Sequence, residues 1–261
     1  MRWIWGPWSE ADYRLDRMTF RDLLRAYFTY YAIQVYLLLG AVGWLVALRS
    51  GTGLGATLAA AGFMVVIYPL VEYGLHRFVL HARWMYKNPY TARLWKRIHY
   101  DHHQNPNDLK VLFGALYTTL PMLVVVTMPL GYLIGGAGGL WAAFATGCLL
   151  FAFYEFCHCV QHLPVMPKNR WLRDIKRRHL AHHFHNEQGN FGITNPLWDR
   201  IVGTFYDPPN TRPKSPTAFN LGYTEEERRR YPWVARLSAD DRSYAQARRR
   251  SRSTARSHGA P

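Results

Sequence analysis

Ten histidines in four short motifs are the residues of this sequence best suited to chemistry. Eleven of its twelve histidines lie between His76 and His185, and ten of them form the patterns H-x4-H, H-x2-HH, H-x3-H and a second H-x2-HH. Neutral imidazole is a ligand for zinc, copper, iron and nickel, so the clusters indicate a metal site. The ten motif residues are His76, His81, His99, His102, His103, His158, His162, His179, His182 and His183.

The spacing within three of the motifs favours convergence on helices. Residues three or four apart share one helix face, so each H-x2-HH motif and the H-x3-H motif can aim its rings at one place. The neighbours His102 and His103 diverge by about 100° on a helix, so each can serve a different metal. A catalytic zinc site takes three protein ligands, whereas ten histidines shared by two ions give five each. Two such ions would keep a position for oxygen or substrate.

The pair His76 and His81 needs a departure from regular helix geometry. A separation of five residues places two side chains about 140° apart on a straight α-helix. The helix that carries this pair must therefore end or bend between them, where an apolar segment gives way to a polar one.

Long uncharged segments separate the motifs and indicate the elements that position them. The chain is 49% hydrophobic, and residues 27–48, 50–71 and 111–154 contain no Asp, Glu, Lys or Arg. About 20 apolar residues cross a bilayer core. The third segment is long enough for two crossings, and a glycine-rich break at 135–139 lies inside it. We therefore predict membrane spans at about 27–48, 52–72, 112–134 and 138–157.

The basic residues predict the orientation of these spans. Lys and Arg accumulate in cytoplasmic loops, and four crossings would place 31 of the 32 basic residues on one side. That side, which holds both termini and the histidine motifs, is expected to be cytoplasmic. The apolar segments exclude a disordered chain and a nucleic-acid binder despite the net charge of +15, and three cysteines are too few for a disulfide scaffold.

The predicted fold is all-α: an integral membrane protein with four transmembrane helices in two hairpins and a cytoplasmic helical cap that carries a histidine-rich di-metal site. An N-terminal cytoplasmic segment, 1–26, precedes the membrane domain at 27–206. Residues 207–261 are expected to be a proline-containing surface linker followed by a basic, disordered tail. The alternative is a large soluble helical core, but such cores rarely leave runs of this length uncharged.

Taken together, the motifs resemble the fatty acid hydroxylase and sterol desaturase superfamily, a group of histidine-box membrane oxygenases. Residues Glu72 to His81, the sequence His182-His183-Phe-His-Asn, and the stretch from Asn190 to Thr204 are similar to its fatty acid 2-hydroxylase branch. The resemblance covers about residues 60–206 and implies a non-haem di-iron centre. It implies that one metal takes His76, His81, His99, His103 and His182, and the other His102, His158, His162, His179 and His183.

The chemistry that the resemblance implies is O2-dependent attack on an unactivated C–H bond, with two iron ions, O2 and external electrons. Zinc is expected to replace iron in some purified protein. Polar residues near the ligands would orient their outer N–H groups. The candidates for this role are Glu72, Asp101, Glu155, His185 and Asp199.

A separate electron donor is expected. Some members of the 2-hydroxylase branch carry a fused cytochrome b5 domain, whereas about 26 residues precede the first predicted span here. A ferredoxin or a cytochrome b5-like protein with its reductase would then supply electrons. The basic cytoplasmic face would attract an acidic donor. The expected location is the cell membrane in a bacterium or the endoplasmic reticulum in a eukaryote.

The leading functional hypothesis is a membrane-lipid hydroxylase that acts on fatty acyl chains, sphingolipids or aminolipids such as ornithine lipid. The nearest alternatives are a sterol desaturase or methyl oxidase and a carotenoid hydroxylase of the same superfamily, because the metal chemistry is shared. Two other classes are a histidine-rich metal transporter and a zinc-storing membrane protein. A transporter's ligands should lie near the membrane midplane, but these histidines lie outside the predicted spans.

Overall fold

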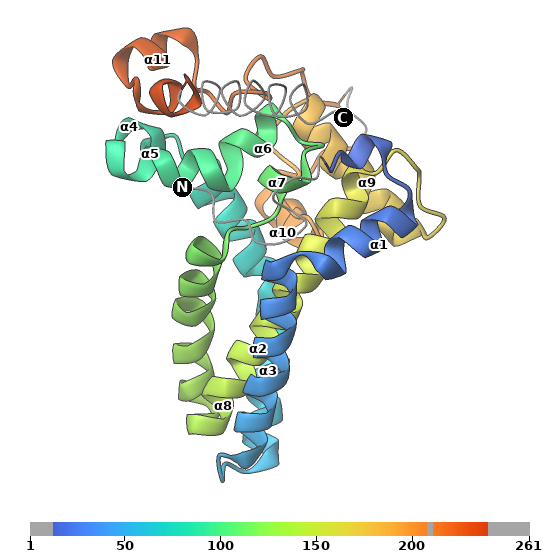
Figure 1. Cartoon of the computed structure of the whole chain (residues 1–261), viewed down its shortest axis with the longest axis vertical. Helices are drawn as coiled ribbons and strands as arrows, with labels where there is room; N and C mark the ends of the chain where they lie inside the picture. The colour runs from blue at the N-terminus through green and yellow to red at the C-terminus, as the bar shows by residue number, and fades with distance from the viewer. Residues whose placement is uncertain (1–12, 208–210, 240–261) are drawn as a thin grey trace, which may run out of the picture.

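The computed structural model describes residues 13–207 and 211–239 and consists of a helical stem with a helical head (Figure 1). Within these residues every regular element is a helix, apart from one isolated bridge between Arg14 and Asp108. The all-α prediction is therefore correct for the described residues. The basic tail predicted at the C-terminal end lies outside them.

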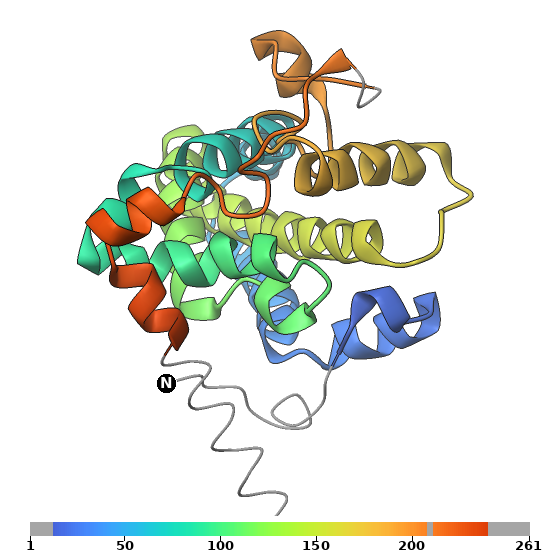
Figure 2. The same ribbon diagram turned by 90° about the horizontal axis from the view of Figure 1, so that it is seen from above.

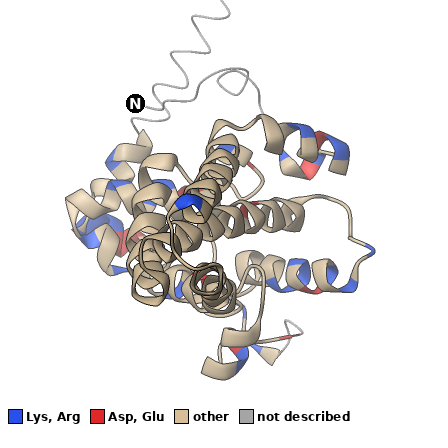
Figure 3. Cartoon of the chain, turned by 90° about the horizontal axis from the view of Figure 1, so that it is seen from below, with Lys and Arg blue, Asp and Glu red and all other residues tan. Residues whose placement is uncertain are grey.

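The stem contains α2 (Tyr31–Arg49), α3 (Leu54–Leu75) and α8 (Leu116–His162). The helical stretches Tyr31–Arg49, Leu54–Lys87 and Leu109–His162 are long and apolar enough to cross a membrane. Their outward faces expose large apolar side chains, as in lipid-facing helices, and within α2, α3 and α8 the charged residues are Arg49, Glu72 and Glu155 alone. Figure 3 views the stem end-on, with most Lys and Arg in the surrounding head.

Helix α8 reverses direction at its glycine-rich centre. Gly135 and Gly136 have non-helical backbone angles, and Gly136 has a φ of 54°, which glycine adopts without strain. The two arms then pack closely, because a Cβ on Gly131 would collide with the carbonyl oxygen of Gly139. The reversal lies at the break predicted between residues 134 and 138. The second arm continues to His162, past the predicted end of the span at 157.

The start of the first predicted span differs in the structure. Residues Phe20–Thr29 form a separate helix, α1, and α2 begins only at Tyr31, because Tyr30 between them is extended (φ −74°, ψ 124°). A capping box between Thr19 and Asp22 starts α1, and the Tyr27 hydroxyl donates to the Ala152 carbonyl at 2.5 Å. The uncharged segment therefore predicted the start of this span four residues too early, because the absence of charge does not reveal the helix break at Tyr30.

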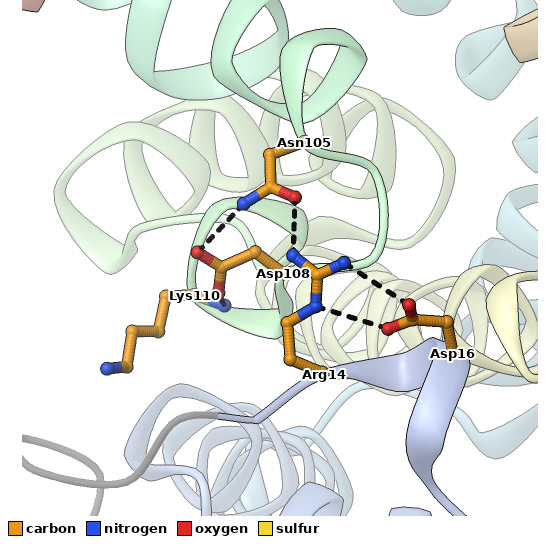
Figure 4. Close-up of polar contacts among 5 residues, drawn as sticks. All are labelled: Arg14, Asp16, Asn105, Asp108 and Lys110. Atoms are coloured by element: carbon orange, nitrogen blue, oxygen red, sulfur yellow. Dashed lines mark hydrogen bonds and ion pairs between the residues drawn. The ribbon is translucent and has the colours of Figure 1, made fainter.

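The N-terminal segment is tied to the loop that follows the first H-x2-HH motif (Figure 4). The Arg14 guanidinium donates to Asp16 at 3.2 Å and to the Asn105 side-chain oxygen at 3.0 Å. Asp108, bonded to Asn105, also accepts from the backbone N–H of Lys110 at 3.0 Å. This network fixes the chain between that motif and the start of the α8 hairpin.

The head is built from short helices that surround the upper ends of α3 and α8 (Figure 2). In that view α9 runs beside the last turns of α8, and the two are in contact. The elements of the head are η2 (Leu15–Arg17), α1, η3 (His76–Leu80), α4 (Trp84–Lys87), α5 (Pro89–Trp95), η4 (Lys96–Tyr100), α6 (Asp101–Gln104), α7 (Leu109–Leu112), α9 (Arg170–Phe184), α10 (Leu197–Val202) and α11 (Glu225–Arg230).

Residues 211–223, which we call the C-terminal strap, lie against the head. The strap buries Ala218, Leu221 and Tyr223, and the Gln104 side chain donates to the Phe219 carbonyl. The sequence interpretation of 207–261 as a linker and tail was therefore wrong for this stretch. Its prolines resemble those of a linker, but its apolar residues are spaced irregularly and give no helical or strand period.

Candidate metal centre

A π-helical turn brings His76 and His81 together. Helix α3 continues into η3, where the N–H of His81 donates to the His76 carbonyl at 3.1 Å, five residues back. The wider turn replaces the 140° separation of a regular helix, and the two ring centroids lie 4.9 Å apart. The predicted departure from regular helix geometry is confirmed.

The remaining motifs lie on helices, as their spacing predicts. His99 lies in a second π-helical turn, η4, which leads into α6 with His102 and His103. His158 and His162 form the last turns of α8. The H-x2-HH motif of α9 lies on that helix's buried face together with Ile175, and the Asn169 side chain caps the helix start by accepting from Leu172 N at 3.1 Å.

Five histidines form what we call the first histidine group, with one ring nitrogen from each within 4.8 Å of the others. His99 Nε2 is its centre, at 3.2 Å from His76 Nε2, 2.9 Å from His81 Nε2 and 3.1 Å from His103 Nε2. Its members are His76, His81, His99, His103 and His182.

The other five form the second histidine group by the same measure. The His102 and His183 Nε2 atoms are 3.1 Å apart, and those of His162 and His179 are 2.9 Å apart. Its members are His102, His158, His162, His179 and His183, so both groups have the membership that the resemblance implies. Each adjacent pair, 102–103 and 182–183, is split between the groups, as expected from the angle between neighbours on a helix.

The arrangement of lone pairs in the first group fits a bound cation. His76 Nδ1 and His103 Nδ1 lie 2.5 and 2.9 Å from the carbonyl oxygens of Phe191 and Ala218. A carbonyl only accepts, so both Nδ1 atoms carry protons, and in a neutral ring Nε2 is then a bare acceptor. His99 Nε2 can donate to one of these acceptors at most. A metal ion with bonds of about 2.0–2.1 Å would satisfy all of them at nitrogen separations near 3 Å.

Burial keeps these rings neutral, as ligation requires. Removal from water lowers the pKa of His103 and of His182 to about 3, and it holds the pKa of His99, His102 and His183 well below the ordinary value of 6.5. Neighbouring imidazoles lower the pKa of His182 further. The metal-free rings are therefore neutral across the neutral pH range, each with one ring nitrogen free of a proton and able to bind a metal.

We expect the metal-free protein to lose stability in mild acid. When folding lowers a pKa, the unfolded chain takes up protons that the folded chain does not, so stability is complete above pH 6.5 and falls toward pH 3. When the pH falls from 6.5 to 5.5, His103 and His182 should each lower the free energy of unfolding by about 1 kcal/mol. Thermal unfolding of chelator-treated protein in detergent measures this. A melting temperature that is unchanged or higher at pH 5.5 would contradict it.

Backbone carbonyls, rather than the predicted side chains, orient the first group. Phe191 and Ala218 accept from His76 and His103, and the Gly189 carbonyl accepts from His182 Nδ1 at 2.8 Å. In the second group the Nδ1 atoms of His102, His162, His179 and His183 are buried and have no partner among the described residues. The two groups therefore differ in what fixes their rings.

Two of the five predicted outer residues act through the loop that presents Phe191. Glu72 accepts from the N–H and hydroxyl of Thr194 at 2.8 and 2.6 Å and from the N–H of Ile193. Asp199 accepts from the N–H groups of Phe191 and Gly192 at 2.9 and 2.7 Å. Both carboxylates thus hold the loop backbone, and neither bonds a histidine.

The other three predicted outer residues have different partners. Asp101 accepts from Lys96 Nζ at 2.8 Å, and His185 Nε2 lies 2.6 Å from the Arg212 carbonyl. Glu155 Oε1 accepts from the N–H of Gly114 at 2.8 Å, while its buried Oε2 has no partner among the described residues.

An apolar cavity of about 260 Å³ descends from the histidines into the stem. Its upper wall includes His76, His99, His102 and His158, with Glu155 beside them. Farther down, it runs between α3 and the two arms of α8 to Met64, Thr127 and Gly147. Along α8, Gly147 lies eleven positions before His158, a separation of roughly 16 Å. The cavity has the shape and polarity for a hydrocarbon chain with one end at the histidines.

A model of the fatty acid hydroxylase family matches residues 61–204, which include all ten motif histidines. The chain belongs to the fatty acid hydroxylase family. The resemblance predicted from the histidine motifs is therefore confirmed. The structure also has the expected histidine clusters and apolar helices consistent with a membrane protein.

Several proteins named as fatty acid hydroxylases are similar to this chain. The ceramide very long chain fatty acid hydroxylase SCS7 of Saccharomyces cerevisiae is 32% identical over 151 residues, 55% of this chain and 37% of the yeast protein. The dihydroceramide fatty acyl 2-hydroxylase FAH2 of Arabidopsis thaliana is 32% identical over 150 residues, 54% of this chain and 58% of its own length. The chain thus spans well under two thirds of these relatives.

The structural comparison gives the same family. The solved structure of full-length scs7p, in which only the hydroxylase domain is visible, matches with a TM-score of 0.60 and 26% identity. The match covers 79% of this chain and 83% of that chain. The fold described above is therefore the hydroxylase-domain fold.

Proposed function

We propose that this protein is a membrane-lipid hydroxylase that uses O2 to oxidise a C–H bond of a fatty acyl chain at a di-iron centre. The observation that carries the proposal is the position of ten converging histidines at the top of an apolar cavity. Relatives named as ceramide and fatty acyl 2-hydroxylases support an acyl substrate. Oxidation near the polar end of the chain would leave the hydrocarbon tail in the cavity.

The two histidine groups would each hold one ion. Bound iron would supply O2 activation and hydrogen abstraction, with electrons from a separate ferredoxin or cytochrome b5-like donor. The Phe191, Ala218 and Gly189 carbonyls would fix the rings of the first group, and the apolar walls would exclude water. Glu155, with its unpartnered oxygen at the cavity wall, would accept a hydrogen bond from a substrate hydroxyl or amide.

The proposed membrane placement has four crossings. Helices α2 and α3 would make the first hairpin, and the two arms of α8 the second. The basic head would be cytoplasmic, with the histidines just above the bilayer. An acyl chain could then enter the cavity from the membrane while the electron donor approaches from the cytoplasm.

The same geometry argues against metal transport and zinc storage. A transported ion binds near the middle of the membrane spans, whereas the described histidines gather at the head end of the stem. A storage site has no use for an apolar cavity of about 260 Å³ that reaches its ligands.

Lipid mass spectrometry of a deletion strain against its wild type tests the proposed reaction. We expect one lipid class that is an oxygen atom heavier than its precursor to disappear, and to return when the gene is restored. Purified protein from iron-replete cells, once reduced, should consume O2 with the precursor. Identical lipid profiles together with no substrate-dependent O2 uptake would contradict the proposal.

A further inference from the structure

Glu187 joins the two segments that present carbonyls to His103 and His182. It is fully buried after the end of α9, and its Oε1 accepts from Thr217 Oγ1 at 2.5 Å and from Gln188 Nε2 at 2.9 Å. Thr217 directly precedes Ala218, whose carbonyl accepts from His103. Gly189, two residues after Glu187, presents its carbonyl to His182.

Backbone contacts hold the C-terminal strap to the same loop. The N–H of Ser215 donates to the His185 carbonyl, and the Asn186 side chain donates to the Pro213 carbonyl, both at 2.8 Å. The Arg212 guanidinium donates to the Gln188 carbonyl at 2.8 Å. Two side-chain contacts flank Ala218: the Glu187–Thr217 bond on one side and the bond from the Gln104 side chain to the Phe219 carbonyl on the other. The first of them joins the strap to the loop that follows α9, so it helps to place the part of the strap that reaches His103.

The electrostatics of Glu187 make this contact strong. Burial raises the pKa of its carboxyl, but hydrogen bonds from Ser215, Thr217 and Gln188 outweigh this and lower the pKa below the usual value. Glu187 is therefore ionised at neutral pH. Hydrogen bonds to an ionised acceptor are shorter and roughly twice as strong as neutral ones.

We propose that Glu187 and Thr217 are positioning residues that set the metal affinity of the first histidine group. The proposal rests on the metal centre of the proposed function, but not on its substrate. Acceptors that orient a ligating imidazole fix its tautomer and raise its basicity, and their loss typically weakens metal binding by about 10–100-fold. The second group provides an internal reference, because none of its four unpartnered Nδ1 atoms bonds the strap within the described residues.

Release of zinc from the loaded, purified protein to a colorimetric chelator tests the proposal. Two single variants assign the phases of zinc release: His99→Ala alters the first group, and His162→Ala alters the second. In Thr217→Val, which removes the hydroxyl at nearly constant shape but leaves the Ala218 carbonyl in the chain, we expect the first-group phase to accelerate by up to about 10-fold, the lower figure for loss of a direct acceptor. The second phase should stay unchanged. Glu187→Gln should act in the same direction, and Thr217→Ser should restore the wild-type rate.

The control is Thr224→Val, which removes a hydroxyl that caps α11 by accepting from Glu227 N. It should leave both phases unchanged. Unaltered release in both Thr217→Val and Glu187→Gln would overturn the proposal, as would equal acceleration of both phases, which indicates general loosening. Zinc release is measured without lipid or O2. A protein that binds two ions but oxidises no lipid would therefore refute the proposed reaction and leave the proposal for Glu187 and Thr217 standing. Wild-type protein that holds no metal would refute both.

Discussion

A His183→Ala variant is expected to form no hydroxylated lipid and to keep about one of two metal ions. His183 belongs to the second histidine group, where its Nε2 lies 3.1 Å from that of His102. Alanine removes a ligand rather than an orienting partner, so the loss of affinity should exceed the roughly 100-fold upper range for outer residues. Metal analysis and a lipid-oxidation assay on the same preparation measure both effects.

The partner His102 turns this prediction into a test of the grouping. The effects of substituting two residues that act as one unit are not additive. The double variant with His102→Ala and His183→Ala should therefore lose no more lipid oxidation or bound metal than either single variant. Arg177→Ala is the matched control, because Arg177 lies on the exposed side of the same helix, paired with Asp207 at 3.1 Å. Lipid turnover retained in both single histidine variants would remove these residues from the site.

The sequence predicted the histidine arrangement well because it depends on local geometry. The angle between adjacent residues on a helix splits 102 from 103 and 182 from 183, and the structure divides them in this way. The apolar segments likewise predicted the stem, since helix length and side-chain polarity are properties of the chain itself. The break at Gly135 and Gly136 was visible for the same reason.

The contacts that orient the rings could not be predicted from side-chain types. The acceptors for His76, His103 and His182 are carbonyls, which every residue carries, so no residue identity marks them. Ala218 lies 115 residues from His103, in a segment whose prolines suggested a linker. Glu187 was missed as well, although a carboxylate four residues after His183 offered a signal. Its role depends on the strap, and only the tertiary fold places the strap beside it.

Replacing Glu72 with alanine is expected to cause the largest loss of stability of any single change at the metal centre. The variant would leave the N–H groups of Ile193 and Thr194 and the Thr194 hydroxyl buried without their acceptor. A buried unsatisfied polar group costs about 1–3 kcal/mol. Three of them therefore amount to about 3–9 kcal/mol, within the total stability of about 5–15 kcal/mol of a typical domain. Thermal unfolding in detergent and the yield of folded protein measure this loss.

A milder change at the same position separates folding from metal binding. In Glu72→Gln the amide oxygen can still accept from the two backbone N–H groups, and the N–H2 group faces the Thr194 hydroxyl, which can turn to accept, so a smaller loss of stability is expected. Because the Thr194 loop also carries Phe191, the acceptor for His76, the folded fraction should release its first-group metal faster than wild type. The control is Glu225→Ala, which removes an exposed carboxylate paired with Arg228 at 3.1 Å and should change neither property. If Glu72→Gln unfolded and released metal as the wild type does, the loop would be held by its other contacts, of which the Asp199 bonds to Phe191 and Gly192 are the strongest candidates.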